Sequence, residues 1–173
     1  MTEKLRVLFS EQEINERIAQ LGAQISKDYE GKELHMICIL RGSVFFLCEL
    51  AKRITIPVTL DFMSVSSYGN SKESSGIVRI MKDLDEPLEG RHVLIVEDII
   101  DSGKTLDHLV PILYARKPLD IKLCALLNKP SRREVDIAID YFGYEIPDVF
   151  VVGYGLDHAQ KYRNLPYIAT TEA

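Results

Sequence analysis

Hydrophobic positions near the start of the chain repeat with the period of a helix. Ser10 and Glu13 have the spacing of a capping box, in which each side chain bonds the backbone N–H of the other residue at a helix start. Ile14, Ile18 and Leu21 follow at intervals of four and three residues, which places them on one face. The pattern predicts an amphipathic helix that begins after Ser10 and buries this apolar stripe.

Further along the chain, short apolar or alternating runs predict strands and two longer runs predict helices. The run at 92–100 is continuous and rich in β-branched residues, which is typical of a strand covered on both faces. In the second of these helices Pro111 should lie near the start or cause a kink. The predicted strands are 35–40, 58–65, 76–84, 92–100, 122–129 and 150–156, and the predicted helices are 44–54 and 105–117.

The alternation of strands and helices favours an α/β fold with a central, mainly parallel sheet flanked by helices. A length of 173 residues suits one domain with a substantial core, so we expect residues 1–173 to form a single unit. Polar clusters follow several of the strands, at 41–43, 97–105, 129 and 156–158. Ligands of such sheets bind beyond the carboxyl ends of the strands, so these clusters are expected to form one site.

Composition narrows the class of protein. With 46% hydrophobic and 27% charged residues, the chain is typical of a globular protein, and its net charge of -5 disfavours a binder of nucleic-acid phosphates. No apolar run reaches the roughly 18–20 residues of a membrane span, and the first ten residues lack a signal-peptide core. Cys38, Cys48 and Cys124 form no C-x-x-C pair, so we expect neither disulfides nor zinc, and a cytoplasmic setting.

The segment 93–106, VLIVEDIIDSGKTL, places an acidic pair before a turn suited to an anion. Its Gly-Lys-Thr end invites comparison with the nucleotide-binding P-loop. That pattern needs a glycine where the chain has Asp98, whose carboxylate would repel phosphates. A dinucleotide fingerprint at 153–155 fails in the same way, because His158 stands where the third glycine belongs.

A phosphate can instead lie at the start of the helix that follows this segment. Backbone N–H groups at the positive end of a helix attract anions, and two hydroxyls and a glycine assist here. The residues that can surround the phosphate are Asp101, Ser102, Gly103, Lys104 and Thr105.

Glu97 and Asp98 suit hydroxyl groups or a divalent cation, because ionised carboxylates only accept hydrogen bonds. A ligand with a phosphate at one end and a diol beside it, such as a ribose 5-phosphate, has the matching shape. In the plainer alternative, Glu97 and Asp98 only solvate a strand end and Asp101 caps the next helix.

These residues resemble the binding motif for 5-phosphoribosyl 1-diphosphate (PRPP) of type I phosphoribosyltransferases, and the Ile-Ile-Asp-Ser-Gly-Lys-Thr form is similar to the 6-oxopurine branch, the hypoxanthine(-guanine) enzymes. The resemblance extends over about 10–168. It includes 40–43, similar to a pyrophosphate loop, 66–69, similar to a mobile catalytic loop, and Lys129 with 150–157, similar to a purine-binding region. It also implies a small hood built from the terminal segments, with the mobile loop near 66–76.

The resemblance implies transfer of the phosphoribosyl group from PRPP to hypoxanthine or guanine, with Mg²⁺ and release of pyrophosphate. Glu97 and Asp98 would hold the ribose hydroxyls and help organise Mg²⁺, and Asp157 would ligate a second Mg²⁺. Asp101 would act as general base at the purine N7. The remaining residues of the turn, Ser102, Gly103, Lys104 and Thr105, would bind the 5-phosphate.

The other roles also come from the resemblance. Lys129 would donate to the purine O6, Phe150 would stack on the base and Val151 would contribute its backbone C=O. Leu40, Arg41 and Gly42 would bind pyrophosphate together with Arg163, and the Leu40–Arg41 peptide can be cis in this family. The mobile loop would be Ser66, Ser67, Tyr68 and Gly69, and Asp157 would also border the purine.

Two other functions remain open at this stage. A regulatory RNA-binding protein on the same fold would need a basic face, which the net charge of -5 disfavours. A transferase that prefers xanthine or guanine would differ only in contacts to the purine 2-position, and these are largely backbone contacts. For the enzyme we expect small-molecule substrates, no nucleic-acid or membrane partner, and a homodimer or homotetramer.

Overall fold

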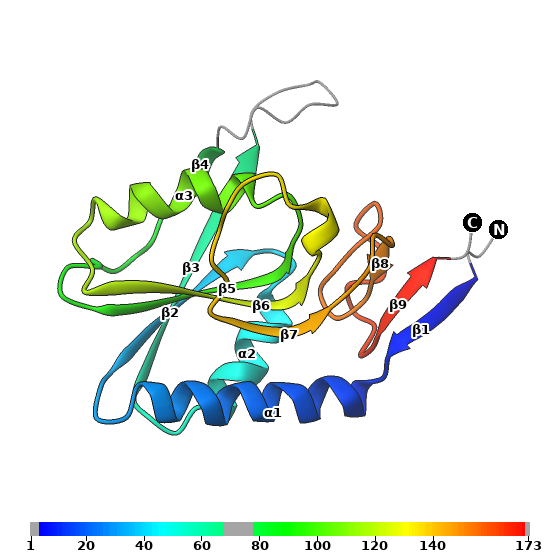
Figure 1. The fold of residues 1–173 in the computed structure, drawn as a ribbon, viewed down its shortest axis with the longest axis horizontal. Coiled ribbons are helices and arrows are strands. Elements are labelled where there is room, and N and C mark those ends of the chain that lie inside the picture. Colours follow the sequence, from blue (N-terminus) through cyan, green and yellow to red (C-terminus); the bar gives the residue numbers. More distant parts are fainter. Residues whose placement is uncertain (1–3, 68–77, 172–173) are drawn as a thin grey trace.

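The computed structural model describes residues 4–67 and 78–171. Its centre is a six-stranded sheet in the order β4-β3-β2-β5-β6-β7 (Figure 1). The pairs β2–β3, β2–β5, β5–β6 and β6–β7 are parallel, and β3–β4 is antiparallel. The strands are β2 Leu34–Leu40, β3 Val58–Ser67, β4 Val78–Lys82, β5 His92–Ile100, β6 Asp120–Asn128 and β7 Tyr141–Glu145. The predicted mainly parallel sheet is confirmed.

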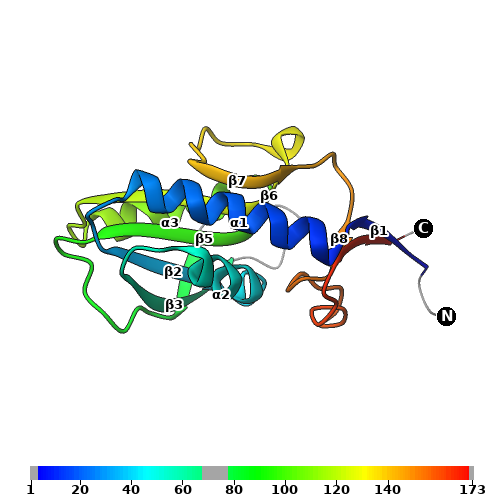
Figure 2. The same ribbon diagram turned by 90° about the horizontal axis from the view of Figure 1, so that it is seen from below.

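Helices cover both faces of this sheet. Helices α1 (Glu11–Asp28) and α2 (Val44–Arg53) lie on one face, and α3 (Lys104–Tyr114) lies on the other (Figure 2). A single turn of 3-10 helix, η1 (Pro130–Arg132), follows β6. Because both faces are covered, β2 is buried over its first six residues and the middle of β5 is inaccessible to solvent.

Helix α1 forms as its sequence predicts. Ser10 is the N-cap, and the reciprocal bonds of a capping box join it to Glu13. The apolar stripe of Ile14, Ile18 and Leu21 is buried, and the helix packs against α2 and β7. The capping box therefore fixes where the helix starts, and the stripe fixes which face meets the sheet.

A second, smaller sheet joins the two ends of the chain. Its order is β1-β9-β8, with β1 Leu5–Phe9, β8 Val151–Val152 and β9 Ile168–Thr171 in antiparallel pairs. It lies beyond one end of the large sheet, at the right of Figure 1, as the hood implied by the family resemblance. One hydrophobic core cluster contains residues of both sheets and of α1 and α2.

The structure differs from the sequence prediction at several elements. The expected strand 150–156 is reduced to Val151–Val152, which belongs to the small sheet, because two left-handed glycines, Gly153 and Gly155, turn the chain. Pro111 lies in the eighth position of α3, which excludes a place near the helix start and leaves the predicted kink as the other alternative. Strand β7 was not anticipated, since its sequence, YFGYE, offers only five residues.

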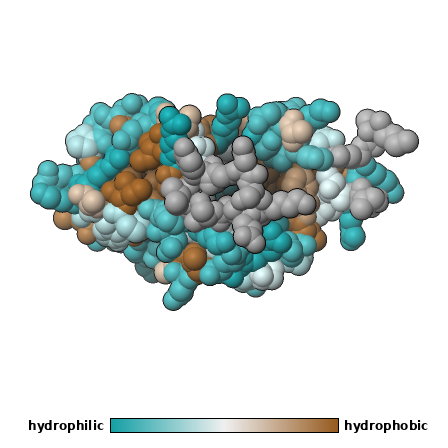
Figure 3. All heavy atoms as spheres, turned by 90° about the horizontal axis from the view of Figure 1, so that it is seen from above, coloured by the Kyte–Doolittle hydropathy of each residue, from teal (hydrophilic) through white to brown (hydrophobic). Residues whose placement is uncertain are grey.

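The side of the molecule that carries α3 is largely hydrophilic, with hydrophobic residues gathered toward one end (Figure 3). Helix α3 and the segment after it contribute the exposed apolar side chains Ile112, Tyr114 and Leu119. None of the helices in the described part of the chain has the length and apolar character needed to cross a membrane.

Candidate active site

The carboxyl ends of β5, β6 and β7 meet at one edge of the large sheet. Ile100 is opposite Asn128, and Asn128 is opposite Glu145, so the loops that follow these strands start side by side. The backbone N–H of Lys129 donates to Ile100 O at 3.0 Å, and that of Ile146 donates to Asn128 O at 2.9 Å. These bonds hold Lys129 beside Ile100, the residue that precedes Asp101. The ends of the strands therefore lie together, as predicted.

Glu97 and Asp98 lie in the last part of β5, next to the loop after β2. The closeness of that loop depends on Gly42: a Cβ there would lie 1.7 Å from Asp98 Oδ2. Burial, and then the neighbouring charge of Asp98, raise the pKa of Glu97 well above its ordinary value. Burial also raises the pKa of Asp98 to about 6, although its carboxylate accepts the Ile99 N–H. These two carboxylates are held where a cation or hydroxyl groups would stabilise their charge.

The turn between β5 and α3 encloses a hollow of about 230 Å³. Gly103 is the N-cap of α3 with φ 83°, and a glycine has no side chain with which to cap the helix. The alternative in which Asp101 merely caps α3 is therefore wrong. Ser102 Oγ accepts from the Lys104 N–H at 3.4 Å, and the positive end of the helix that follows favours an anion. The hollow is lined by Glu97, Ile99, Ile100, Asp101, Ser102, Gly103, Thr105 and Leu106.

The loop after β6 is docked onto this turn by side chains that the sequence prediction missed. Arg133 donates to Asp101 O at 3.1 Å and to Asn128 Oδ1 at 2.6 Å, and the Glu134 N–H donates to Ser102 O at 3.0 Å. Lys104 pairs with Glu134 across the same junction. Only the run of charges after Lys129, RRE, signalled these contacts in the sequence.

The predicted purine-binding residues surround the mouth of this edge. Lys129 is 7% exposed, whereas Phe150 is 53% exposed. The Phe150 ring meets His158 edge-on, with centroids 5.4 Å apart. Val151 is buried in β8, where its backbone pairs with β9. A buried cation and an exposed aromatic ring, from different strand ends, can bind a flat heterocycle.

The segment 153–163 returns to the loop after β2. A Cβ on Gly155 would lie 2.0 Å from Gly42 O, so the two backbones are in direct contact. Arg163 donates to Gly155 O at 2.7 Å and pairs with Asp157 at 2.9 Å. Arg41 reaches the same segment by donating to Gln160 Oε1 at 3.3 Å. The structure thus brings the predicted residues Gly42, Asp157 and Arg163 together beside Asp98.

The peptide between Leu40 and Arg41 is cis, the form that the resemblance allowed. Of the four residues assigned to a mobile loop, Ser66 and Ser67 are the last residues of β3. Tyr68 and Gly69 lie outside the described residues. The predicted mobile loop therefore starts at the carboxyl end of β3, which pairs with β2.

The carboxylates at this edge could supply only part of the coordination shell of Mg²⁺. Among residues 4–67 and 78–171, no three His, Cys, Asp or Glu side chains form a group that could hold a metal ion. Mg²⁺ keeps several waters and commonly takes one or two carboxylates together with substrate oxygens. The Glu97–Asp98 pair fits such a half-site, since burial leaves both carboxylates poorly solvated. Asp157 is already engaged by Arg163 and by the Gln160 N–H.

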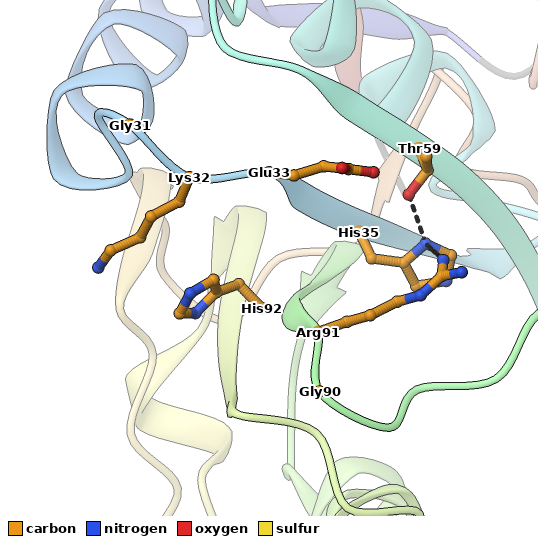
Figure 4. A pocket seen from close by; sticks show the side chains of 8 residues that line it. All are labelled: Gly31, Lys32, Glu33, His35, Thr59, Gly90, Arg91 and His92. Atoms are coloured by element: carbon orange, nitrogen blue, oxygen red, sulfur yellow. Dashed lines mark hydrogen bonds between the residues drawn. The ribbon is translucent and has the colours of Figure 1, made fainter.

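A second hollow, of about 460 Å³, lies at the opposite, amino-terminal edge of the sheet (Figure 4). There the buried His35 accepts at Nδ1 from an Arg91 N–H at 3.2 Å, and Thr59 Oγ1 lies 2.7 Å from the same nitrogen. Arg91 also pairs with Glu86. The Arg91 side chain joins two of these residues, His35 and Glu86, whereas the ring of Phe150 is exposed at the carboxyl edge.

Comparison with known proteins identifies similar chains over nearly the whole length. The family model described as "Phosphoribosyl transferase domain" matches residues 8–159. The hypoxanthine-guanine phosphoribosyltransferase of Bacillus subtilis is 52% identical over 163 residues, which cover 94% of this chain and 91% of the relative. The hypoxanthine phosphoribosyltransferase of Haemophilus influenzae is 50% identical over 165 residues, 94% of this chain and 92% of the relative.

Solved structures give the same result. A crystal structure of a hypoxanthine phosphoribosyltransferase from Staphylococcus aureus superposes with a TM-score of 0.94 at 48% identity, covering 96% of this chain and 91% of that one. A hypoxanthine-guanine phosphoribosyltransferase from Bacillus anthracis, with a HEPES molecule in its active site, has a TM-score of 0.94 at 47% identity and covers 98% of this chain and 99% of that one.

Proposed function

The chain belongs to the phosphoribosyl transferase domain family, and from this premise we propose that it transfers the 5-phosphoribosyl group of PRPP to N9 of hypoxanthine, and of guanine, in purine salvage. The C1–O bond to pyrophosphate breaks and the N9–C1 bond forms, which gives the nucleoside monophosphate and pyrophosphate. The observation that carries the proposal is the placement of the buried Lys129 directly beside the β5 end that bears Asp101.

The phosphoribosyl group is bound by the end of β5 and the turn after it. Ser102, Gly103, Lys104 and Thr105 bind the 5-phosphate at the start of α3, where backbone N–H groups and the helix dipole favour an anion. Glu97 and Asp98 accept from the ribose hydroxyls and would be the residues that hold Mg²⁺. When bound, Mg²⁺ supplies positive charge to the diphosphate oxygens.

The base is recognised along the edge that carries N7 and O6. Asp101 accepts the ring proton at N7 as N9 attacks, and Lys129 donates to O6. Adenine presents an amino group at the 6-position, and an ammonium has no acceptor to offer it, so adenine is rejected. Phe150 stacks on the ring, Val151 contributes its backbone C=O, and Asp157 borders the base.

The leaving pyrophosphate is bound on the other side of β5. The backbone of Leu40, Arg41 and Gly42 and the side chain of Arg163 stabilise its developing charge, which is the main term in a reaction of this kind. Asp157 would hold a second Mg²⁺ only in exchange for its ion pair with Arg163. Ser66 and Ser67, at the end of β3, begin the segment assigned to the mobile catalytic loop, whose function would be to exclude water, and Tyr68 and Gly69 lie outside the described residues.

At the scale of the whole protein, the proposal takes 1–173 as one domain, supported by the core cluster shared between the two sheets. The enzyme works in the cytoplasm as a homodimer or homotetramer, with PRPP and purine bases as its partners. It binds neither nucleic acid nor membranes.

The proposal is tested by measuring pyrophosphate release from PRPP and Mg²⁺ with hypoxanthine, guanine, xanthine and adenine in turn. We expect turnover with hypoxanthine and guanine, none with adenine, and loss of all turnover in EDTA. The rates of pyrophosphate release with guanine and with xanthine, each divided by the rate with hypoxanthine, define the preference for the group at the purine 2-position. No pyrophosphate release with any base, together with salt-sensitive nanomolar RNA binding, would make the protein an RNA-binding regulator instead.

A further inference from the structure

Lys129 has an acidic partner that the proposed mechanism does not use. Its Nζ lies 3.8 Å from Asp148 Oδ1, and the side chain of Lys129 is 8% exposed while that of Asp148 is 54% exposed. Asp148 follows β7 and Pro147, in a turn closed by the Val149 N–H donating to Pro147 O. The cation is therefore buried and the anion comes from the neighbouring strand end, at the rim of the site.

The second oxygen of Asp148 is engaged as well. Arg132 Nη1 lies 3.5 Å from Asp148 Oδ2, and Arg132 Nε lies 3.4 Å from Asp101 Oδ1. The four groups Lys129, Asp148, Arg132 and Asp101 alternate in charge and come from the ends of β5, β6 and β7. Asp148 and Arg132 thus connect Lys129 to Asp101, the two residues assigned to the same edge of the purine.

This arrangement addresses a physical problem of the site. A lysine ammonium ends a flexible four-carbon stem and has three rotatable donors, so it defines no direction by itself. A buried cation also needs an anionic partner to offset its desolvation. Asp148 meets both needs, since one of its oxygens faces Lys129 and the other is held by Arg132.

We propose that Asp148 is a positioning residue for recognition of the 6-oxo group, holding the Lys129 ammonium at the distance from Asp101 that the O6 and N7 atoms of a 6-oxopurine require. The inference rests on the proposed function and assigns Asp148 no contact with substrate. It predicts that Asp148 matters only for ligands that carry an oxygen at the 6-position.

The test removes the charge of Asp148 and, separately, the 6-oxygen of the ligand. Dissociation constants are measured by calorimetry for inosine 5′-monophosphate and for purine riboside 5′-monophosphate, which lacks the 6-oxygen. Asp148→Asn should weaken inosine monophosphate binding roughly tenfold, the size of one impaired charge-assisted hydrogen bond, and change binding of the analogue less than about twofold. The KM for PRPP should stay within about twofold of wild type, because the phosphate turn is untouched.

Two sets of variants complete the test. Asp83→Asn is the matched control, because Asp83 is half-exposed and pairs with Arg116 at 2.7 Å outside the site, so both nucleotides should bind as to wild type. In a Lys129→Ala background, Asp148→Asn should have no further effect on inosine monophosphate.

Equal losses for the two nucleotides, an unchanged affinity for inosine monophosphate, or additive effects with Lys129→Ala would overturn the inference. Failure of the proposed function is a separate outcome, because it would be seen as absent turnover of hypoxanthine by the wild-type protein.

Discussion

At the scale of single residues, the chemistry of the site depends on groups that can be assigned from the sequence and on contacts that cannot. Asp101 and Lys129 can be assigned from sequence because each follows a recognisable strand and belongs to a family motif. The approach of Gly155 to Gly42 O, and of Gly42 to Asp98, could not be predicted, since these contacts join segments more than fifty residues apart. Asp148 was missed because an isolated surface charge carries no pattern, and Arg132 was missed because its run of charges does not show which group it pairs with.

The role of Asp101 is tested by Asp101→Asn. The amide keeps the shape of the turn but cannot accept a ring proton as a base, so kcat should fall by about 10²–10⁴ while PRPP affinity stays within about threefold. Steady-state kinetics and PRPP titration measure the two quantities. Asp107→Asn, in the exposed first turn of α3, is the matched control and should retain wild-type kcat. A near-normal kcat in Asp101→Asn would exclude the general-base role.

Gly155 and Gly90 form a pair that separates backbone strain from steric contact. Both have positive φ, 98° and 72°, but only Gly155 has an atom within 4 Å of an added Cβ. Either substitution by alanine should lower the free energy of unfolding by about 1–2 kcal/mol from the left-handed backbone alone. Gly155→Ala should lower it further and raise the KM for PRPP, because the added carbon displaces the Gly42 loop. Equal stability and equal KM in the two variants would show that the contact is unimportant.

At the scale of elements, prediction succeeded where one local pattern determines the outcome. Strand β5 was predicted at 92–100, as observed, because an uninterrupted β-branched run in a sheet covered on both faces has few alternatives. Strand β8 was predicted at seven residues and has two, because Gly153 and Gly155 adopt left-handed conformations that end the strand. The apolar residues around these glycines gave no sign of this turn. Pro111 is accommodated inside α3, so tertiary packing outweighs the lost N–H there.

The capping box of α1 gives a prediction at this scale. Ser10→Ala removes the oxygen that accepts the Glu13 N–H at 3.2 Å. The unfolding free energy should fall by about 1 kcal/mol, and Tm by about 2–4 °C, with kcat and KM unchanged. Ser10→Thr keeps the hydroxyl and should recover most of the loss, as calorimetry would show. A loss of catalysis in Ser10→Ala would mean that α1 affects the site directly.

At the scale of the whole molecule, the two edges of one sheet have different uses. Parallel strands place polar groups at both ends, and the carboxyl edge gathers Glu97, Asp101 and Lys129 while the amino edge buries His35 against Arg91 and Asp61. The site edge could be predicted from sequence, since the general rule for parallel sheets selects it. The polar network at the amino edge could not, because it depends on the register of β2 with β3 and β5.

The amino edge makes stability depend on pH. Burial, and then the charge of Arg91, lower the pKa of His35 below the ordinary 6.5. Protonation of His35 therefore favours the unfolded chain. The free energy of unfolding should begin to fall as the pH drops through about 6.5, the pKa of the unfolded histidine, and this fall should end once the pH is below the pKa of His35 in the folded protein. Glu97 and Asp98 act in the opposite sense, because burial raises their pKa values. A comparison of variants isolates the histidine.

Urea unfolding measures the free energy of unfolding at pH 7.5 and at pH 5.5. The decrease between the two pH values should be smaller in His35→Asn than in wild type. An asparagine oxygen can still accept near the position of Nδ1, but it does not titrate in this range. His108→Asn, on the exposed side of α3, is the matched control for replacing a histidine. Parallel changes in wild type and His35→Asn would contradict the assignment of this pH dependence to His35.

The central claim, that a buried lysine and an aspartate select a 6-oxopurine for phosphoribosyl transfer, is tested most directly by competition. The protein is given equal amounts of hypoxanthine and adenine with PRPP and Mg²⁺, and the nucleotides formed are identified by mass. We expect inosine monophosphate in more than about 100-fold excess over adenosine monophosphate, because the site cannot pair with a 6-amino group. Comparable amounts of the two nucleotides, or no nucleotide at all, would contradict it.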